Sequence, residues 1–227
     1  RSADLGHRLV AIDDDAPEPG GYERYVHNAA LLPGVVLALG VGGITAFFLF
    51  APQYSRDLGL SSSSGIFFVY ALVSLAIRIF GARVPERLGP RRTVTIALSA
   101  IGIGLATVAA VSEPWAVWFA AALLGVGAAF HYPSLNALAV NRVGDRERAV
   151  VISSFTMFFE LGSALTGLAV GRLAVVVGKQ DAFYGGVVAV VIGLVVLRTW
   201  LVPADSPEAH GFGRRNDLVD AGRLPAD

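Results

Sequence analysis

Long uncharged, apolar runs alternate with short charged segments along most of this chain. Residues 29–51 and 93–112, for example, contain no Asp, Glu, Lys or Arg. A run of about 20 such residues has the length of a helix that crosses ~30 Å of hydrocarbon. The pattern predicts six membrane-spanning helices, at residues 29–51, 65–81, 93–112, 115–140, 149–177 and 182–202. We expect Pro52 to end the first of them.

Both ends of the chain are polar. Residues 1–28 contain three consecutive Asp residues together with Pro and Gly, which is typical of a flexible linker. Residues 203–227 form a second polar tail. The sequence therefore divides into a linker (1–28), a six-helix transmembrane bundle (29–202) and a C-terminal tail (203–227). Because the first residue is Arg1, we interpret the chain as a piece of a longer protein, or as a processed or truncated one.

Composition supports the membrane class. Hydrophobic residues make up 54% of the chain and charged residues 16%, whereas a soluble domain carries about 25% charged residues. The mean hydropathy is +0.60. The formal net charge is zero, which does not favour a nucleic-acid partner.

Motifs of enzymes and nucleotide-driven pumps are missing from the sequence. It has no phosphate-binding Gly-Lys-Ser/Thr loop, no Cys for thiol chemistry or thiolate metal sites, and four scattered His residues without metal-ligand spacing. The serine run 61–64 suggests an intramembrane protease only weakly, because polar caps are common at the entrance of a span. We therefore expect no enzymatic activity, no cofactor and no metal.

The basic residues are distributed very unevenly between the two sides of the predicted bundle. With six spans, thirteen Lys and Arg residues lie on the side of the termini, and two, Arg56 and Lys179, lie on the other. Cytoplasmic loops of membrane proteins carry an excess of Lys and Arg. The count predicts that both termini are cytoplasmic and that the protein lies in the plasma membrane.

The strongly basic segment 78–92, between the second and third spans, contains a recognisable motif. Its residues 82–92 read Ala-Arg-Val-Pro-Glu-Arg-Leu-Gly-Pro-Arg-Arg. This resembles the loop signature of the major facilitator superfamily, Gly-x-x-x-Asp-Arg-x-Gly-x-Arg-Arg, with Ala82 and Glu86 at the first Gly and the Asp. The matching residues are Glu86, Arg87, Gly89, Arg91 and Arg92. The resemblance implies that the acidic residue caps or pairs at a helix end and that the basic ones hold a cytoplasmic gate. The alternative is that these charges only set topology.

Two later segments resemble the same family. Residues 125–148 look like helix ten and its following loop in permeases of the sugar and drug efflux type, and residues 158–171 look like helix eleven. Their order implies the C-terminal half of a 12-helix fold, built from two inverted three-helix repeats. The second and fifth spans end in weakly similar sequences, with Gly81 and Gly171 at matching positions, which agrees with such repeats.

The resemblance implies a function for the whole protein. It would be a secondary transporter, coupled to protons, that moves a small solute by alternating access. Its partners would be the solute, membrane lipid and an N-terminal six-helix half. The alternative is a non-transporting six-span scaffold or a truncated paralogue, and the substrate and direction stay open.

Ionisable residues inside spans are costly and are therefore candidates for function. Glu160 lies about 15 Å into the fifth span, in the middle of the membrane. Ser153, Thr156, Glu160 and Ala164 follow helical spacing and predict a small, polar face turned into the bundle, with Phe155 lying elsewhere. A carboxyl group withdrawn from water favours its neutral form, as a proton carrier requires. The alternatives for Glu160 are a hydrogen bond to another helix, for instance to His131, or direct contact with the substrate.

The fourth span supplies further candidates around a proline. His131 precedes Pro133, which lacks a backbone donor and predicts a local kink. His131 lines the solute cavity or bonds a neighbouring helix, and the sequence leaves these two roles equally open. Tyr132 and Asn136 are weaker candidates for the same path.

Overall fold

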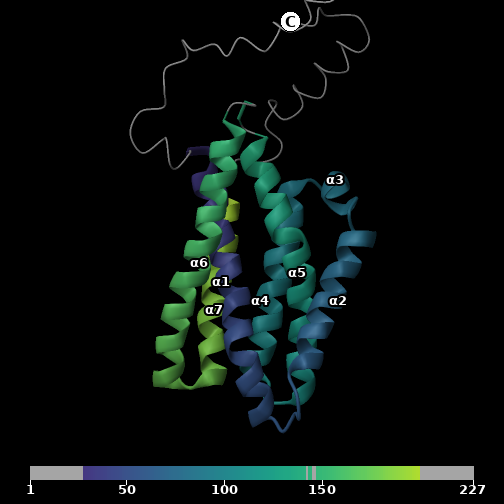
Figure 1. Ribbon diagram of the computed structural model, residues 1–227, viewed down its shortest axis with the longest axis vertical. Coiled ribbons are helices and arrows are strands. Elements are labelled where there is room, and N and C mark those ends of the chain that lie inside the picture. The colour runs from purple at the N-terminus through teal and green to yellow at the C-terminus, as the bar shows by residue number, and fades with distance from the viewer. Residues whose placement is uncertain (1–27, 142, 145–146, 200–227) are drawn as a thin grey trace, which may run out of the picture.

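The computed structural model describes residues 28–141, 143–144 and 147–199, and every regular element within them is a helix (Figure 1). The helices are α1 (Asn28–Asp57), α2 (Ser64–Phe80), α3 (Val84–Leu88), α4 (Pro90–Ala110), α5 (Pro114–Val140), α6 (Arg148–Val177) and α7 (Lys179–Thr199). The all-α prediction is thus confirmed for this part of the chain. The predicted linker up to residue 27, the tail from residue 200, and Arg142 and Arg146 of the second basic loop lie outside the described residues.

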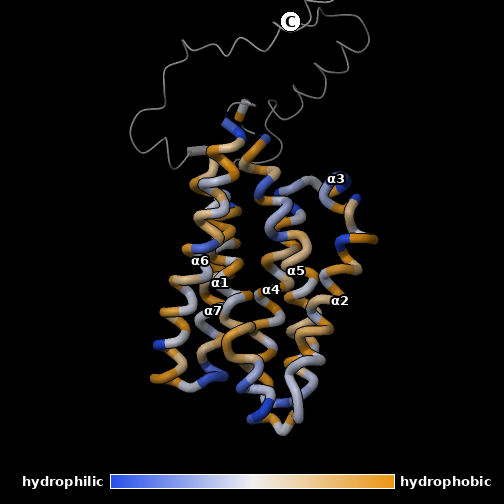
Figure 2. The backbone as a smooth tube through the Cα atoms, viewed as in Figure 1, coloured by the Kyte–Doolittle hydropathy of each residue, from blue (hydrophilic) through white to orange (hydrophobic). Residues whose placement is uncertain are grey.

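Five of the described helices, α1, α4, α5, α6 and α7, are long and apolar enough to cross a membrane. Helix α2 takes the place of the second predicted span; it is apolar but has only 17 residues, or about 25 Å of helix. Apolar residues run along the height of the bundle, and most hydrophilic residues lie near its two ends (Figure 2). Large apolar side chains on α2, α6 and α7 are exposed, as a lipid-facing surface requires.

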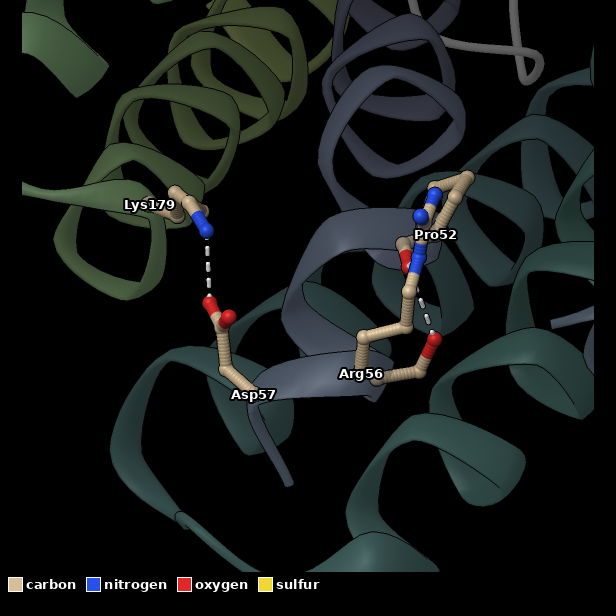
Figure 3. A network of polar contacts seen from close by, with 5 residues as sticks. Pro52, Arg56, Asp57 and Lys179 are labelled. Carbon is tan, nitrogen blue, oxygen red and sulfur yellow. Dashed lines mark hydrogen bonds and ion pairs between the residues drawn. The ribbon is translucent and has the colours of Figure 1, made fainter. Parts of the chain in front are cut away.

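Helix α1 does not end at Pro52, contrary to the expectation from the sequence. It continues for five residues to Asp57. Proline removes one backbone hydrogen bond, but membrane helices tolerate that loss where other donors are near. Beyond the proline, Arg56 Nε donates to the Pro52 carbonyl at 3.1 Å (Figure 3). The Ser55 hydroxyl donates to the same carbonyl at 3.2 Å, so polar side chains support the last turn of α1 after the proline. Helix α5 likewise runs through Pro133 without a break.

The basic segment after α2 is folded rather than a simple turn. It contains the short helix α3, and Gly89 then joins α3 to α4 with a φ of +79°, a conformation that favours glycine. Helix α4 begins at Pro90, because proline fits the first helical position without losing a bond. We call the end of the bundle that carries α3 the basic end, and the other the opposite end.

Helix contacts repeat in two matching triplets. Helices α1, α2 and α4 form the first triplet, and α5, α6 and α7 form the second. Helix α1 packs against α6 and α7, and α5 correspondingly packs against α2 and α4. Helix α1 also packs against its counterpart α5, and α4 against its counterpart α7. Since consecutive spans run in opposite directions, α1 and α5 are antiparallel, which is the arrangement of an inverted repeat (Figure 1).

Glycines bring the central helices close together. A Cβ on Gly127 of α5 would meet the side chain of Ile101 and, at 3.0 Å, the carbonyl oxygen of Ala97, both in α4. A Cβ on Gly162 of α6 would lie 2.5 Å from the Cα of Ala38 in α1. Such small residues at helix contacts allow the dense packing on which membrane bundles depend. They also fix the rotation of each helix about its own axis.

Polar contacts join three helices at the opposite end. Lys179 at the start of α7 lies 2.7 Å from the carboxylate of Asp57 at the end of α1 (Figure 3). The neighbouring Gln180 donates to the carbonyl oxygen of Ala109 at 3.1 Å and to the hydroxyl of Ser112 at 2.9 Å. These contacts fasten α7 to the ends of α1 and α4.

Candidate functional site

A cavity of about 900 Å³ opens between α1, α2, α5 and α6. These are the first two helices of each triplet, whereas α4 and α7 contribute no residue to its wall. Most of the wall is apolar. Its charged and aromatic side chains are Arg78, Glu160, His131, Phe48, Tyr70, Tyr132 and Phe159. The geometry is that of a ligand site, with few polar groups set in an apolar surface.

Glu160 lies on this wall, 12 residues after the first residue of α6, or about 18 Å along the helix. Its side chain is exposed in this chain. Within the described residues its carboxylate has no hydrogen-bond or ion-pair partner. In particular, the alternative of a hydrogen bond to His131 is not what the structure shows, since the His131 ring bonds elsewhere.

The face of α6 that packs into the bundle differs from the one expected. Ser153, Thr156, Glu160 and Ala164 are all exposed. The buried residues of α6 are Val151, Ser154, Phe155, Gly162 and Val170. The expectation that Phe155 lies away from the bundle is therefore wrong. The close contact of Gly162 with α1 sets the rotation of α6, so that Phe155 turns inward and Glu160 turns toward the cavity.

His131 joins α5 to α1 and also lines the cavity. Its side chain is 1% exposed, and Nε2 donates to the carbonyl oxygen of Leu37 at 3.3 Å. The ring fills the space beside Gly40, where a Cβ would collide with it. The second ring nitrogen, Nδ1, is buried without a partner among the described residues. His131 thus both contacts α1 and lines the cavity, while its role toward a solute stays a prediction.

Aromatic side chains line the cavity in two pairs. Phe48 of α1 and Tyr70 of α2 meet edge to face, with ring centres 4.8 Å apart. Tyr132 of α5 and Phe159 of α6 meet in the same way at 6.2 Å. Each pair spans two helices and presents a flat apolar surface that favours aromatic or cationic groups.

Asn136 does not line this cavity. It lies one helical turn beyond Tyr132 on α5 and is half-buried. Its Oδ1 atom is buried and has no partner in the described part of the chain.

The loop-signature residues lie at the basic end, away from the cavity wall. Glu86 and Arg87 belong to α3 and are exposed, and neither α3 nor α4 has a side-chain cap at its start. Arg91 Nη2 donates to the carbonyl oxygen of Arg198 in the last turn of α7, at 3.2 Å. A cation at a helix C-terminus complements the helix dipole. The signature thus joins α4 to α7, while its role in a gate stays a prediction.

Arg78 is the cavity residue that sequence reasoning missed. It lies in the last turn of α2, near the interface, where an arginine side chain can extend toward water. In the structure its side chain also lines the cavity, on the same wall as Tyr70. The signal was present in the sequence, because Tyr70, Ser74 and Arg78 form a polar row at steps of four along an otherwise apolar helix.

Comparisons with known proteins agree with this architecture. The family model of the Major Facilitator Superfamily matches residues 18–224. An uncharacterized transporter of this type from Salmonella typhimurium is 26% identical over 169 residues, which cover 74% of this chain and 44% of the relative. The multidrug resistance protein MdtH of Cronobacter sakazakii is 34% identical over 100 residues, which cover 44% of this chain and 25% of MdtH. The chain thus spans less than half the length of these curated relatives.

A solved structure supports the same fold. The crystal structure of the peptide transporter POT in complex with alafosfalin matches with a TM-score of 0.61 at 20% identity. The match covers 88% of this chain and 45% of the transporter. Given a family model that matches almost the whole sequence and several helices long and apolar enough to cross a membrane, the chain belongs to the Major Facilitator Superfamily of transporters and is a multi-pass membrane protein.

Proposed function

We propose that this chain is the C-terminal six-helix half of a secondary transporter of the sugar and drug efflux type. The whole protein moves a small amphipathic solute across the plasma membrane by alternating access, driven by a proton gradient. The observation that supports the proposal is the cavity of about 900 Å³, which is lined by the first two helices of each triplet, α1, α2, α5 and α6. Transporters of this plan hold their substrate between two such halves.

The exposed walls of the bundle and the length of the relatives support the proposal of a second half. The helices α2 and α6, which form the cavity walls, are largely exposed. Within the described residues, no other helix covers the charged side chains that they carry into the cavity. A charge facing lipid is costly, so a second bundle should close this side. The matched relatives are more than twice as long as the matched part of this chain, which leaves room for that bundle.

Glu160 is the proposed proton-coupling residue. It lies 12 residues after the start of α6, with an exposed side chain on the cavity wall, and no described side chain neutralises it. An acidic residue inside a span that faces a cavity is typical of proton relays in transporters. His131 and Tyr132, which line the same wall, complete the proposed path.

The test uses the protein from its complete reading frame, reconstituted into proteoliposomes with a pH-sensitive dye inside. Three probes are added in turn: lactose, ethidium and 4′-(aminomethyl)biphenyl-4-carboxylate. We expect at least one of them to move protons with the wild-type protein. Glu160→Gln keeps the shape but cannot carry a proton, so this flux should be lost, whereas Glu113→Gln, in an exposed turn, should keep it.

Two results would contradict the proposal. No solute or proton movement with any probe would favour the non-transporting scaffold. Unchanged proton flux in the Glu160→Gln protein would remove Glu160 from the coupling path. The same assay on residues 1–227 alone should show no flux, because half of the cavity wall is missing.

The proposed orientation, with both termini in the cytoplasm, has its own test. The 227 residues contain no Cys, so single cysteines can be introduced into them without a competing thiol from this segment. Ser62 at the opposite end and Ala82 at the basic end are both exposed. In intact cells an impermeant thiol reagent should label Ser62→Cys and spare Ala82→Cys; the reverse pattern would overturn the orientation.

A further inference from the structure

Two opposite charges face the same apolar cavity from different helices. Arg78 reaches it from α2 and Glu160 from α6. These two helices stand at opposite edges of the bundle (Figure 1). Within the described residues, no ion pair joins the two side chains, and neither has another hydrogen-bond partner. The cavity therefore separates a positive wall from a negative wall.

Each charge has an aromatic pair beside it. Tyr70 lies two turns before Arg78 on α2 and packs against Phe48, whereas Phe159 precedes Glu160 directly on α6 and packs against Tyr132. The two walls thus repeat one design, an apolar flat surface with a single charge at its side. The walls differ in the sign of the charge and in its distance along the helix from the aromatic pair.

Arg78 lies in the last turn of α2 and Glu160 12 residues into α6, and both side chains are exposed toward the open cavity. An unpaired charge on an apolar wall is costly unless something in the cavity satisfies it. A solute with one charge would pair with one wall and leave the other wall unpaired. A solute with both charges, held apart by an apolar body, pairs with the two walls at once. Charge-assisted hydrogen bonds to Arg and to a carboxylate are the strongest that such a site can offer.

We propose that the cavity selects a dipolar amphipathic solute, with an ammonium group bound at Glu160, a carboxylate bound at Arg78 and an aromatic body between them. This assigns Arg78 as a ligand-binding residue. The inference rests on the proposed transport function and deepens it, since it names the class of solute.

The test uses four probes with the same biphenyl body. The dipolar probe is 4′-(aminomethyl)biphenyl-4-carboxylate. Its methyl ester carries only the positive charge, its N-acetyl derivative only the negative one, and the N-acetyl methyl ester carries neither. Binding is measured by isothermal titration calorimetry on the protein from its complete reading frame, in lipid nanodiscs at neutral pH.

We expect the dipolar probe to bind at least about tenfold more tightly than either singly charged probe, because each lost ionic hydrogen bond weakens binding by that order. Arg78→Gln should remove the advantage over the ester, and Glu160→Gln should remove the advantage over the N-acetyl derivative. Arg172→Gln, on α6 but outside the cavity wall, should change neither ratio. The neutral probe should bind equally to all variants, which reports that the cavity is intact.

The inference is overturned if the four probes bind equally, if none binds, or if the preference for the dipolar probe survives Arg78→Gln. None of these binding results contradicts the proposed transport function, provided that proton flux with lactose or ethidium depends on Glu160. The opposite result is also possible: proton flux that no longer depends on Glu160, together with a preserved preference for the dipolar probe. This result would support the dipolar site and contradict the coupling role of Glu160.

Discussion

Helices α4 and α2 both pack against α5, yet they are buried to very different extents. Helix α4 buries ten residues along its length, whereas α2 buries only Ile66. Helix α6 resembles α2, with five buried residues among 30. The difference separates a densely packed base, built on α4, α5 and α1, from two thinly packed walls, α2 and α6. The charges that face the cavity, Arg78 and Glu160, lie on the walls.

The comparison suggests that the base provides most of the stability, whereas the walls provide the surface for the proposed function. Packing in the base supplies most of the buried apolar contact, and such regions open last when a protein unfolds. In the proposed function the walls face the solute, lipid and the second half, and they therefore need exposed surface. We therefore expect substitutions in the base to lower stability, and those on the walls to change binding and transport.

The largest difference in stability is expected between alanine substitutions of two leucines. Leu105 of α4 is fully buried, whereas Leu168 of α6 is 71% exposed. Leu105→Ala should lower the free energy of unfolding by about 3 kcal/mol, since it leaves a cavity in packed surroundings. Leu168→Ala should change it by less than about 0.5 kcal/mol. Thermal unfolding of both variants in the same detergent measures this; equal losses would show that base and walls do not differ.

A smaller effect is expected for two glycines. A methyl group at Gly127 would meet Ile101 and the backbone of α4, while Gly171 has open space around it. Gly127→Ala should cost about 2 kcal/mol through overpacking. Gly171→Ala should be neutral or stabilising by a few tenths of a kcal/mol, because alanine favours helix. If Gly127→Ala leaves the melting temperature unchanged, the close approach of α4 and α5 is not required for stability.

The sequence predicted the spans well because their signal is local. Apolar runs and the flanking arginines located the six long helices but not the short α3, and the loop signature identified the family before any coordinates. The predicted end of α1 was wrong, because a proline removes only one hydrogen bond of the preceding turn and the helix can continue beyond it, here with Ser55 and Arg56 bonded to the Pro52 carbonyl.

The sequence could not predict which way the side chains of each helix point, because that direction depends on contacts between distant segments. Gly125 of α5 lies against the backbone of Tyr70 and Ser74, which sets the rotation of α2 and turns Arg78 toward the cavity. Gly162 against Ala38 does the same for α6 and Glu160. Helical spacing shows which residues share a face, but not which neighbour that face meets.

The smallest expected effect concerns the ion pair that fastens the opposite end. Lys179 and Asp57 are 2.7 Å apart, with side chains 40% and 52% exposed. A double-mutant cycle with Lys179→Gln and Asp57→Asn should give a coupling energy of only about 0.5 kcal/mol, and high salt should reduce it. A coupling of several kcal/mol would mean that this end contributes to stability as strongly as the base.

The central claim is that α2 and α6 enclose a water-filled solute cavity, which is tested most directly by cysteine reactivity on α6. Ser163 lines the cavity, whereas Leu168 is exposed elsewhere on the same helix. The protein from its complete reading frame, in nanodiscs, is treated with a water-soluble methanethiosulfonate reagent that attacks ionised thiols. We predict that Ser163→Cys reacts at least about tenfold faster than Leu168→Cys, because a thiol ionises in water and not in lipid. Equal rates, or faster reaction at position 168, would contradict the cavity and with it the proposed transport path.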